Sequence, residues 1–349
     1  MNYVEFLTRL PKVELHSHLE GSVRSTTAIE LAQKHSVRLP SYHPAELYQY
    51  EGIVEFLERY VQVSHAIRDR EDFARVTYEA IEDGATKGNL RYSEMFLNPT
   101  NHYGDGVSYD TAIDGAIDGI RQAEQDYGVK CRLIVAINRS ESPSEAVALV
   151  QQVLDSPRAE VIGIGQDHLT PDYQERPGDF AEAFALAAAN GLGITAHAGE
   201  IDTSTAADVE AALDLGCLRI DHGYKIIDDP SLVDRAQDDG VDFTCCLHST
   251  EKLYGWSDFA NHRIRQMIDA GLNVTLNTDD PSMMNTNIGK EYSAGCVGMG
   301  LTPEQAKKIA LGGVEATWLD DADKRSLRRD FEDQISALEE QLNTLRPAP

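Results

Sequence analysis

The stretch CRLIVAINRSESPSEAVALVQQVLDSPRAEVIGIGQ, residues 131–166, contains the repeating unit from which the fold is predicted. Its two ends are apolar runs of about six residues, which is typical of strands buried on both faces. Between them, Ser142, Pro143 and Glu145 have the spacing of a capping box with proline in the first helical turn, so a helix is expected over 143–154. The stretch therefore predicts a strand–helix–strand unit with parallel strands.

The same unit recurs along the whole chain. Eight apolar runs are predicted as strands, at 13–18, 90–97, 131–138, 161–166, 193–199, 219–224, 242–247 and 273–280. The helices expected between them include 71–87, 109–127, 143–154, 179–190, 206–215 and 231–239. Eight such units in succession predict an α/β protein with a (β/α)8 TIM-type barrel. We expect one domain over 1–349, with a helical, lid-like insertion at 22–70 after the first strand and an extra, solvated C-terminal helix at 320–344.

The chain is strongly acidic, with a net charge of −27 from 58 acidic and 31 basic residues. Such a surface repels polyanions, so nucleic acid is not expected as a partner. The acidic residues are spread along the chain, which indicates either a highly soluble surface or adaptation to a salt-rich host, because salt screens the repulsion between like charges.

The sequence also bears on the compartment. No apolar run approaches the ~20 residues of a membrane helix, so no membrane partner is expected. Residues 1–18 lack the basic and apolar regions of a secretory signal, and a cytoplasmic protein is therefore expected. Five irregularly spaced cysteines without a CxxC pair indicate reduced, buried thiols. The oligomeric state stays open.

Side chains that can bind a metal lie at the ends of three predicted strands. His16 and His18 end the first strand and are two residues apart, which places them on one face. His197 lies near the end of the fifth strand, and Asp279 near the end of the eighth. Active sites of such barrels form at the carboxyl ends of the strands, so we expect these four side chains to meet. Three histidines and one aspartate suit a single Zn²⁺ ion with one position left for water.

Three neighbouring residues have the side chains that proton transfer requires. His222 ends the sixth strand and can orient a water molecule or accept its proton. Glu200 can shuttle a proton to a ring nitrogen of a substrate, and Asp280 can reach a second substrate atom. No lysine lies between residues 130 and 225, so the carboxylated lysine of two-metal barrel hydrolases is absent and a single metal is favoured.

Four segments are similar to a known family: PKVELHSHLEG (11–21), TAHAGE (195–200), IDHGY (220–224) and LNTDDP (276–281). In this order and spacing they closely resemble the adenosine deaminase family of the amidohydrolase superfamily. The resemblance extends over roughly residues 7–318. It implies a zinc-dependent barrel enzyme that removes the 6-amino group of an adenine-type ring as ammonia and leaves a 6-oxopurine.

The resemblance also implies roles for individual residues. The zinc ligands would be His16, His18, His197 and Asp279. Glu200 would protonate N1 of the purine, His222 would position the hydroxide that attacks C6, and Asp280 would hydrogen-bond N7. These roles agree with those derived above from the residues alone.

Departures from the family pattern bear on the substrate. Glu20 stands where adenosine deaminases have an aspartate that contacts ribose, and His168 where they have a glycine whose backbone approaches N3. Both are therefore expected to bind substrate. Tyr224 and Thr278 resemble adenosine deaminases, whereas Glu20 and the segment 91–103 resemble adenine deaminases and divergent branches of the family.

The leading hypothesis is deamination of an adenosine-type purine nucleoside to its inosine-type product. Alternatives are deamination of adenine base, or of a modified adenosine such as aminodeoxyfutalosine or an N6-modified adenosine. Alternatives of other classes are an inactive purine-binding protein and a metal-dependent hydrolase of amides or phosphoesters. The expected partner is thus a small-molecule purine nucleoside or base. His102, His248 and His262 are expected at the surface or in loops, outside the site.

Overall fold

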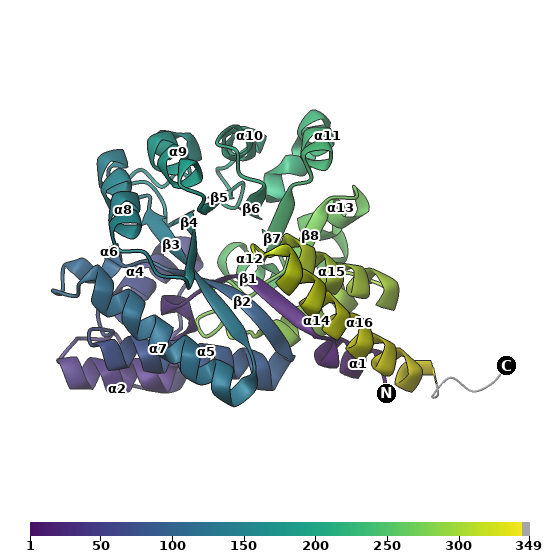
Figure 1. Ribbon diagram of the computed structural model, residues 1–349, viewed down its shortest axis with the longest axis horizontal. Helices are drawn as coiled ribbons and strands as arrows, with labels where there is room; N and C mark the ends of the chain where they lie inside the picture. The colour runs from purple at the N-terminus through teal and green to yellow at the C-terminus, as the bar shows by residue number, and fades with distance from the viewer. Residues whose placement is uncertain (344–349) are drawn as a thin grey trace.

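The computed structural model describes residues 1–343 and contains eight parallel strands in a nearly closed barrel (Figure 1). The strands are β1 (Lys12–His18), β2 (Leu90–Leu97), β3 (Lys130–Asn138), β4 (Val161–Asp167), β5 (Gly193–Ala198), β6 (Arg219–His222), β7 (Asp242–Cys245) and β8 (Asn273–Leu276). They follow one another around the sheet in chain order, and each is parallel to the next. The predicted (β/α)8 barrel is confirmed.

Helices surround the strands and connect them. The main helices outside the barrel are α5 (Arg70–Gly88), α7 (Tyr109–Tyr127), α8 (Pro143–Asp155), α9 (Ala181–Ala189), α10 (Ala206–Asp214), α11 (Pro230–Asp239), α13 (Arg263–Asp269), α14 (Ile288–Gly298) and α15 (Pro303–Ala316). Shorter elements are α1 (Tyr3–Arg9), α6 (Thr100–Tyr103), η2 (Pro177–Phe180), η3 (Tyr224–Asp228), α12 (Leu247–Tyr254) and η4 (Phe259–Asn261). The predicted capping box forms at α8, where Ser142 and Glu145 each accept a hydrogen bond from the other's backbone N–H.

The insertion after the first strand is mainly helical, as predicted. It contains η1 (Glu20–Ser22), α2 (Ser25–His35), α3 (Pro44–Leu47) and α4 (Gly52–Ser64). Helix α4 lies at the mouth of the barrel, where Ile53, Phe56, Leu57 and Tyr60 line the cavity that holds the predicted site residues. The insertion thus supplies one wall of that cavity.

The C-terminal helix α16 (Asp321–Asn343) lies on the outside with most of its described side chains at least partly exposed, but it also buries one apolar stripe that was not expected. Phe331, Ile335 and Leu338 form an apolar stripe at helical spacing that is buried in the hydrophobic core. The many charged residues around this stripe conceal it in the sequence. Residue 344 of the predicted helix lies outside the described residues.

Four strands end before the predicted residues, and left-handed residues follow three of them. The fifth to eighth strands were expected to run to residues 199, 224, 247 and 280, but they end at 198, 222, 245 and 276. Gly199 and Gly223 have φ values of 70° and 72°, and Asp279 has φ 63°. These left-handed residues break the strand geometry. They turn the chain so that the following side chains face the barrel mouth.

The seam of the barrel between β1 and β8 closes beyond the end of β8. Asp279 forms a parallel bridge with Ser17, and its backbone N–H donates to the carbonyl of His16 (3.1 Å). Its carbonyl accepts from the backbone N–H of His18 (2.8 Å). The segments that carry three predicted metal ligands are therefore hydrogen-bonded to each other.

The opposite end of the barrel is filled by Trp318. Its ring lies 3.6 Å from the guanidinium of Arg219, which forms a buried ion pair with Glu94. A Cβ on Gly163 would come within 2.2 Å of the indole, and one on Gly193 within 2.6 Å, so only glycine leaves room for this ring. This packed end leaves the carboxyl ends of the strands as the place for a site.

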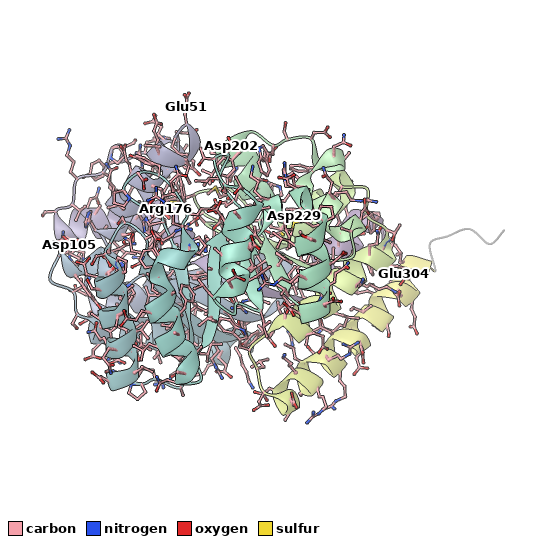
Figure 2. All side chains as sticks on the ribbon, turned by 90° about the horizontal axis from the view of Figure 1, so that it is seen from above. Glu51, Asp105, Arg176, Asp202, Asp229 and Glu304 are labelled. Carbon is pink, nitrogen blue, oxygen red and sulfur yellow. The ribbon has the colours of Figure 1, made fainter. Side chains whose placement is uncertain are left out.

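The surface is acidic on many sides. Figure 2 shows Glu51, Asp105, Asp202, Asp229 and Glu304 well separated over the molecule, in agreement with charge spread along the sequence. Among residues 1–343 we find no helix that combines the length and the apolar character needed to cross a membrane.

Candidate active site and metal centre

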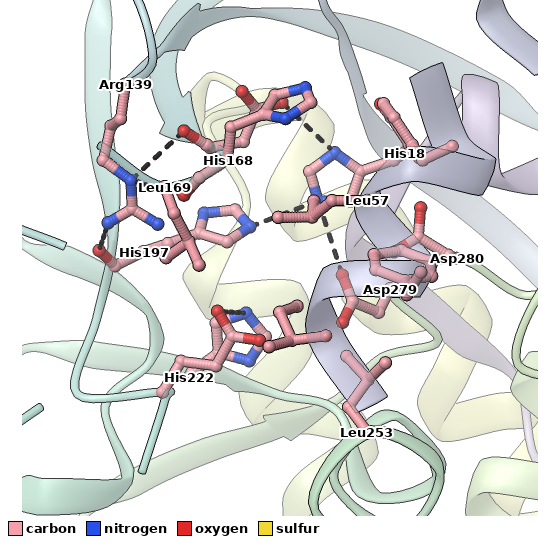
Figure 3. Close-up of a pocket in the computed structure, with 15 residues that line it drawn as sticks. His18, Leu57, Arg139, His168, Leu169, His197, His222, Leu253, Asp279 and Asp280 are labelled. Atoms are coloured by element: carbon pink, nitrogen blue, oxygen red, sulfur yellow. Dashed lines mark hydrogen bonds and ion pairs between the residues drawn. The ribbon is translucent and has the colours of Figure 1, made fainter. Parts of the chain in front are cut away.

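The predicted metal ligands meet at the carboxyl end of the barrel (Figure 3). Nε2 of His197 lies 3.1 Å from Nε2 of His16 and 3.2 Å from Nε2 of His18. Oδ1 of Asp279 lies 3.3 Å and 3.4 Å from the same two atoms of His16 and His18. Ligands at about 2.0–2.1 Å around a tetrahedral zinc ion are separated by about 3.3–3.4 Å, so these spacings fit one zinc ion.

The outer ring nitrogens of the three histidines face oxygen acceptors. Nδ1 of His16 lies 3.2 Å from the carbonyl of Thr244, Nδ1 of His197 lies 3.2 Å from Asp221, and Nδ1 of His18 lies 3.6 Å from Asp167. An Nδ1 that donates to such an oxygen leaves lone pairs on Nε2, as in histidines that bind metals. Lone pairs about 3 Å apart repel each other unless a cation lies between them. The donor set therefore fits a metal ion.

The protonation of these groups favours the same conclusion. Burial and the neighbouring His16 lower the pKa of His197 to about 3, which keeps its ring neutral. Burial opposes ionisation of Asp279, but its contacts with His16 and His18 hold its pKa well below the usual range. Ser249 fixes the other oxygen of Asp279 with a hydrogen bond of 2.6 Å. Neutral imidazole and an ionised carboxylate are the forms that bind metal.

His222 lies beside this donor set. One of its ring nitrogens is within 4.8 Å of ligand atoms of His16, His197 and Asp279. Its Nδ1 lies 3.1 Å from the hydroxyl of Tyr224, and burial lowers its pKa to about 3. Nε2 is buried, has no hydrogen-bond partner among the described residues, and lies 3.6 Å from Glu200. It is thus available to a water molecule or substrate.

Two carboxylic acids in the same cavity favour their protonated forms. Burial, and then the charge of Asp279, raises the pKa of Glu200 above the usual range. The same two causes raise the pKa of Asp280 well above it. Tyr254 on α12 donates a hydrogen bond of 2.9 Å to Glu200. Asp280 packs against Gly21, where an added Cβ would lie only 1.7 Å from its Oδ1. The glycine in the HLEG segment therefore makes room for Asp280.

The two residues predicted to select the substrate occupy different places. His168 lines the cavity, has φ 58°, and packs edge-on against Tyr60 with ring centroids 5.3 Å apart. Glu20 is fully buried but is not among the residues that line the cavity. The structure thus brings His168 to the cavity and keeps Glu20 behind the ring of Tyr60.

His102 and His248 are buried in the helices α6 and α12, so the expectation of surface or loop positions was wrong for both, whereas His262 is buried but lies in the loop between η4 and α13. His102 contacts Glu20 (3.2 Å), His248 pairs with Glu291 (2.7 Å), and His262 lies 2.8 Å from Thr250. Each contacts a polar group in the interior. Of the three, His102 bears on the site, because it holds Glu20.

Residues that the sequence reasoning missed also line or support the site. Arg139 follows β3, and its guanidinium donates to the carbonyls of Asp167, His168 and His197 at 3.1, 2.7 and 2.8 Å. Glu175 lies in the loop after β4 and binds the turn after β5. Arg139 and Asp167 lie at the carboxyl ends of β3 and β4. The rule that active-site residues of such barrels lie at the carboxyl ends of the strands, which located the histidines, therefore also indicates these two residues. No comparable signal marks Glu175.

The barrel and its site, whose His and Asp side chains could hold a metal ion, are those of a hydrolase of the amidohydrolase type. The family model for adenosine deaminase matches residues 11–334. An adenine deaminase from Rhizobium rhizogenes is 32% identical over 321 residues, covering 92% of this chain and 98% of the relative. The chain belongs to the adenosine deaminase family, and it is a hydrolase acting on C–N bonds of cyclic amidines.

Solved structures agree with this assignment. A zinc-bound amidohydrolase from Burkholderia ambifaria superimposes with a TM-score of 0.91 at 33% identity, covering 99% of this chain and 96% of that one. Adenine deaminase from Arthrobacter aurescens has a TM-score of 0.87 at 28% identity, with 94% and 99% covered. An Arabidopsis homologue in complex with IMP has a TM-score of 0.84 at 26% identity, with 95% and 99% covered.

Proposed function

We propose that this protein is a zinc-dependent adenine deaminase, which converts free adenine and water into hypoxanthine and ammonia. The observation that carries the proposal is the cavity wall formed by the insertion. Its side chains are apolar or aromatic, and the carboxylate that would bind a ribose lies behind them. The base therefore replaces the nucleoside, the leading expectation from the sequence, as the preferred substrate.

Both oxygens of Glu20 are already bound by protein groups. Oε2 accepts a hydrogen bond from the hydroxyl of Tyr60 (3.1 Å). Oε1 accepts from the backbone N–H of Asn98 (3.1 Å) and lies 3.2 Å from Nε2 of His102. A ribose hydroxyl at this point would have to displace the ring of Tyr60. Glu20 thus supports the wall and does not present a sugar site.

The remaining wall offers little to a sugar or a phosphate. Ile53, Phe56, Leu57, Leu169 and Leu253 line the cavity. Each ribose hydroxyl left without a partner there costs about 1–3 kcal/mol. The Nε and Nη1 donors of Arg139 are directed at backbone carbonyls, so they are not available to a phosphate group. These features favour a free base over a nucleoside or nucleotide.

The similar proteins support the same substrate. The relatives from Rhizobium rhizogenes and Arthrobacter aurescens are adenine deaminases, and the Arabidopsis homologue is in complex with the purine nucleotide IMP. A small purine is therefore the partner, and the apolar wall of this chain selects the base among purines.

In the proposed mechanism, zinc would be held by His16, His18, His197 and Asp279. When bound, zinc lowers the pKa of a water molecule toward ~7 and so supplies the nucleophile. The residues of the chain move the protons. His222 accepts the proton of the attacking water through its unpartnered Nε2. Glu200, whose raised pKa favours the protonated form, donates to N1 of the ring as C6 is attacked.

The second acidic residue orients the ring. Asp280, also protonated because of its raised pKa, donates a hydrogen bond to N7. Protonated N1 and the hydrogen bond at N7 draw electrons from C6, and transfer of a proton to the amino group then allows ammonia to leave. A carboxylic acid held neutral in an apolar site is suited to such donation.

Steady-state assays with adenine, adenosine and 2′-deoxyadenosine test the proposal, on enzyme with measured zinc content. Two unpaired hydroxyls at the lower figure of about 1 kcal/mol each predict kcat/KM for adenine at least ~30-fold above that for adenosine. Equal or faster turnover of adenosine would refute it. Tyr60→Ala should raise the adenosine-to-adenine ratio by opening the wall to Glu20. Tyr103→Ala, on the exposed side of α6, is the matched control and should leave the ratio unchanged.

A further inference from the structure

The loop between β4 and η2 carries a carboxylate that bonds to the backbone beside Glu200. Glu175 is 1% exposed and lies in this loop. Its Oε2 accepts a hydrogen bond from the N–H of Gly199 (2.5 Å). Its Oε1 accepts from the N–H of Glu200 (2.8 Å) and of Ile201 (3.1 Å). One side chain therefore fixes three consecutive peptide units at the end of β5.

These three peptide units determine where the acidic side chain points. The turn begins at Gly199, whose φ is 70°, and successive N–H groups in such a turn converge on an anion. A Cβ on Gly199 would lie 2.6 Å from Val209 and 3.2 Å from the backbone of Lys225, so the turn has no room to relax toward α10 or η3. The carboxylate of Glu175 occupies the anion position that this turn creates.

The loop that delivers Glu175 is itself strained and internally bonded. Three non-glycine residues in it have left-handed backbone conformations, namely His168 (φ 58°), Tyr173 (φ 59°) and Arg176 (φ 41°). Such strain persists only where the surrounding structure enforces it, and it gathers at functional sites. Here the enforcing contacts are hydrogen bonds between Thr170 and Gln174 on both backbone and side chain.

Arg139 joins this loop to the metal side of the site. Its Nη1 donates to the carbonyls of His197 (2.8 Å) and Glu175 (3.4 Å), and its Nε donates to His168 (2.7 Å). The ends of β3, β4 and β5 are thus connected through one guanidinium. The side chain of Glu200 is held separately, by Tyr254. The backbone of the proton donor therefore depends on Glu175.

We propose that Glu175 is a positioning residue for the deamination: its carboxylate holds the 199–201 turn so that Glu200 meets the ring nitrogen. It does not touch substrate, because it is not among the residues that line the cavity. The inference rests on the proposed deaminase function. A misplacement of about 1 Å at a reacting group can cost ~100-fold in rate, so loss of this clamp affects turnover more than binding.

The test compares Glu175→Gln with Glu182→Gln, the same chemical change at an exposed position of α9. In Glu175→Gln the amide NH₂ faces a backbone N–H, so at least one hydrogen bond is lost. We expect kcat for adenine to fall 10- to 100-fold, KM to change less than about threefold, and zinc content to stay unchanged. Glu182→Gln should match the wild type.

Amide hydrogen exchange gives a readout that is independent of activity. In the zinc-loaded wild type the amides of 199–201 should exchange slowly, and in Glu175→Gln they should exchange at least tenfold faster. Should Glu175→Gln fail to fold, Glu175→Asp withdraws the carboxylate by one methylene and is judged by the same readouts. The inference is overturned if kcat stays within twofold of wild type, if kcat falls only in proportion to lost zinc, or if the wild-type amides exchange rapidly. If the wild-type enzyme does not deaminate adenine, the proposed function is refuted instead. The exchange rates of the 199–201 amides then still test whether Glu175 holds this turn.

Discussion

Replacing Gly21 by alanine probes Asp280, the acid proposed to contact the purine, without touching any proposed metal ligand. The added Cβ would lie 1.7 Å from Oδ1, 2.4 Å from Cγ and 2.5 Å from Cβ of Asp280. Cβ atoms in proteins essentially never approach such atoms closer than 3.0 Å, so the carboxyl group must retreat by at least about 1.3 Å. The backbone at Gly21 does not have a left-handed φ, so alanine is otherwise compatible with this position.

The magnitude follows from that displacement. A shift of about 1 Å in a group that contacts the reacting ring costs ~100-fold in rate, which is about 2.7 kcal/mol in the activation free energy. We therefore expect kcat/KM for adenine to fall by about 100-fold in Gly21→Ala. The assay is steady-state formation of hypoxanthine, with zinc content and the melting temperature measured on the same sample.

The control for Gly21→Ala is an alanine substitution at another glycine, where the added methyl group meets no atom. Gly104→Ala adds a methyl group where no atom lies within 4 Å and where φ is −61°, so it should behave as wild type. If Gly21→Ala retains kcat/KM within about threefold of wild type with zinc bound, Asp280 does not orient the ring. If activity falls only as zinc is lost, the contact supports the metal ligand Asp279 and the reasoning about Asp280 is refuted.

Four further predictions follow from the site and the surface. Glu200→Gln should lower kcat by ~10²–10⁴ while zinc is retained, since general acid catalysis contributes about that factor; unchanged activity would remove Glu200 from the mechanism. Asp221→Ala removes the carboxylate that lies 3.2 Å from Nδ1 of His197, so the affinity for zinc should fall by about 10- to 100-fold in a competition with a chelator. A zinc affinity equal to that of the wild type would contradict this supporting role of Asp221. Burial raises the pKa of Asp242 from 3.8 to about 6, so the folded state binds a proton more tightly than the unfolded state and loses stability as the pH rises from 3.8 to 6. The melting temperature of Asp242→Asn should therefore increase relative to that of the wild type across this pH range. A difference in melting temperature that stays constant with pH would refute the shift. If the net charge of −27 reflects a salt-rich host, the melting temperature should rise between ~0.1 and ~2 M KCl, and a flat or falling curve counts against it.

The barrel and the metal set were predictable because they depend on local patterns and one geometric rule. Buried parallel strands are continuous apolar runs, and eight such runs appear in order. Carboxyl ends of parallel strands meet at one end of the barrel. His16, His18, His197 and Asp279 could therefore be placed together although up to 263 positions separate them in the chain. Their close approach in the structure agrees with that placement.

The substrate could not be predicted from the sequence in the same way, because it depends on which side chains line the cavity. Glu20 was expected at the substrate because the family resemblance places it where adenosine deaminases have a ribose-binding aspartate. Its direction is decided by Tyr60 of α4 and by His102 and Asn98 after β2, which bind both of its oxygens. These contacts join three segments of the chain. The sequence of each segment alone does not show how it packs against the other two.

The sequence by itself determined the barrel, the positions of the metal and proton-transfer residues, and the family, since strand periodicity and strand-end placement are local properties. Only the tertiary structure decided that protein groups bind both oxygens of Glu20, that Glu175 crosses from one loop to hold the turn of the next, and that α16 buries an apolar stripe. The physical reason is that loop conformation and side-chain direction are set by hydrogen bonds and packing between distant segments. Those energies exist only after the barrel has brought the segments together.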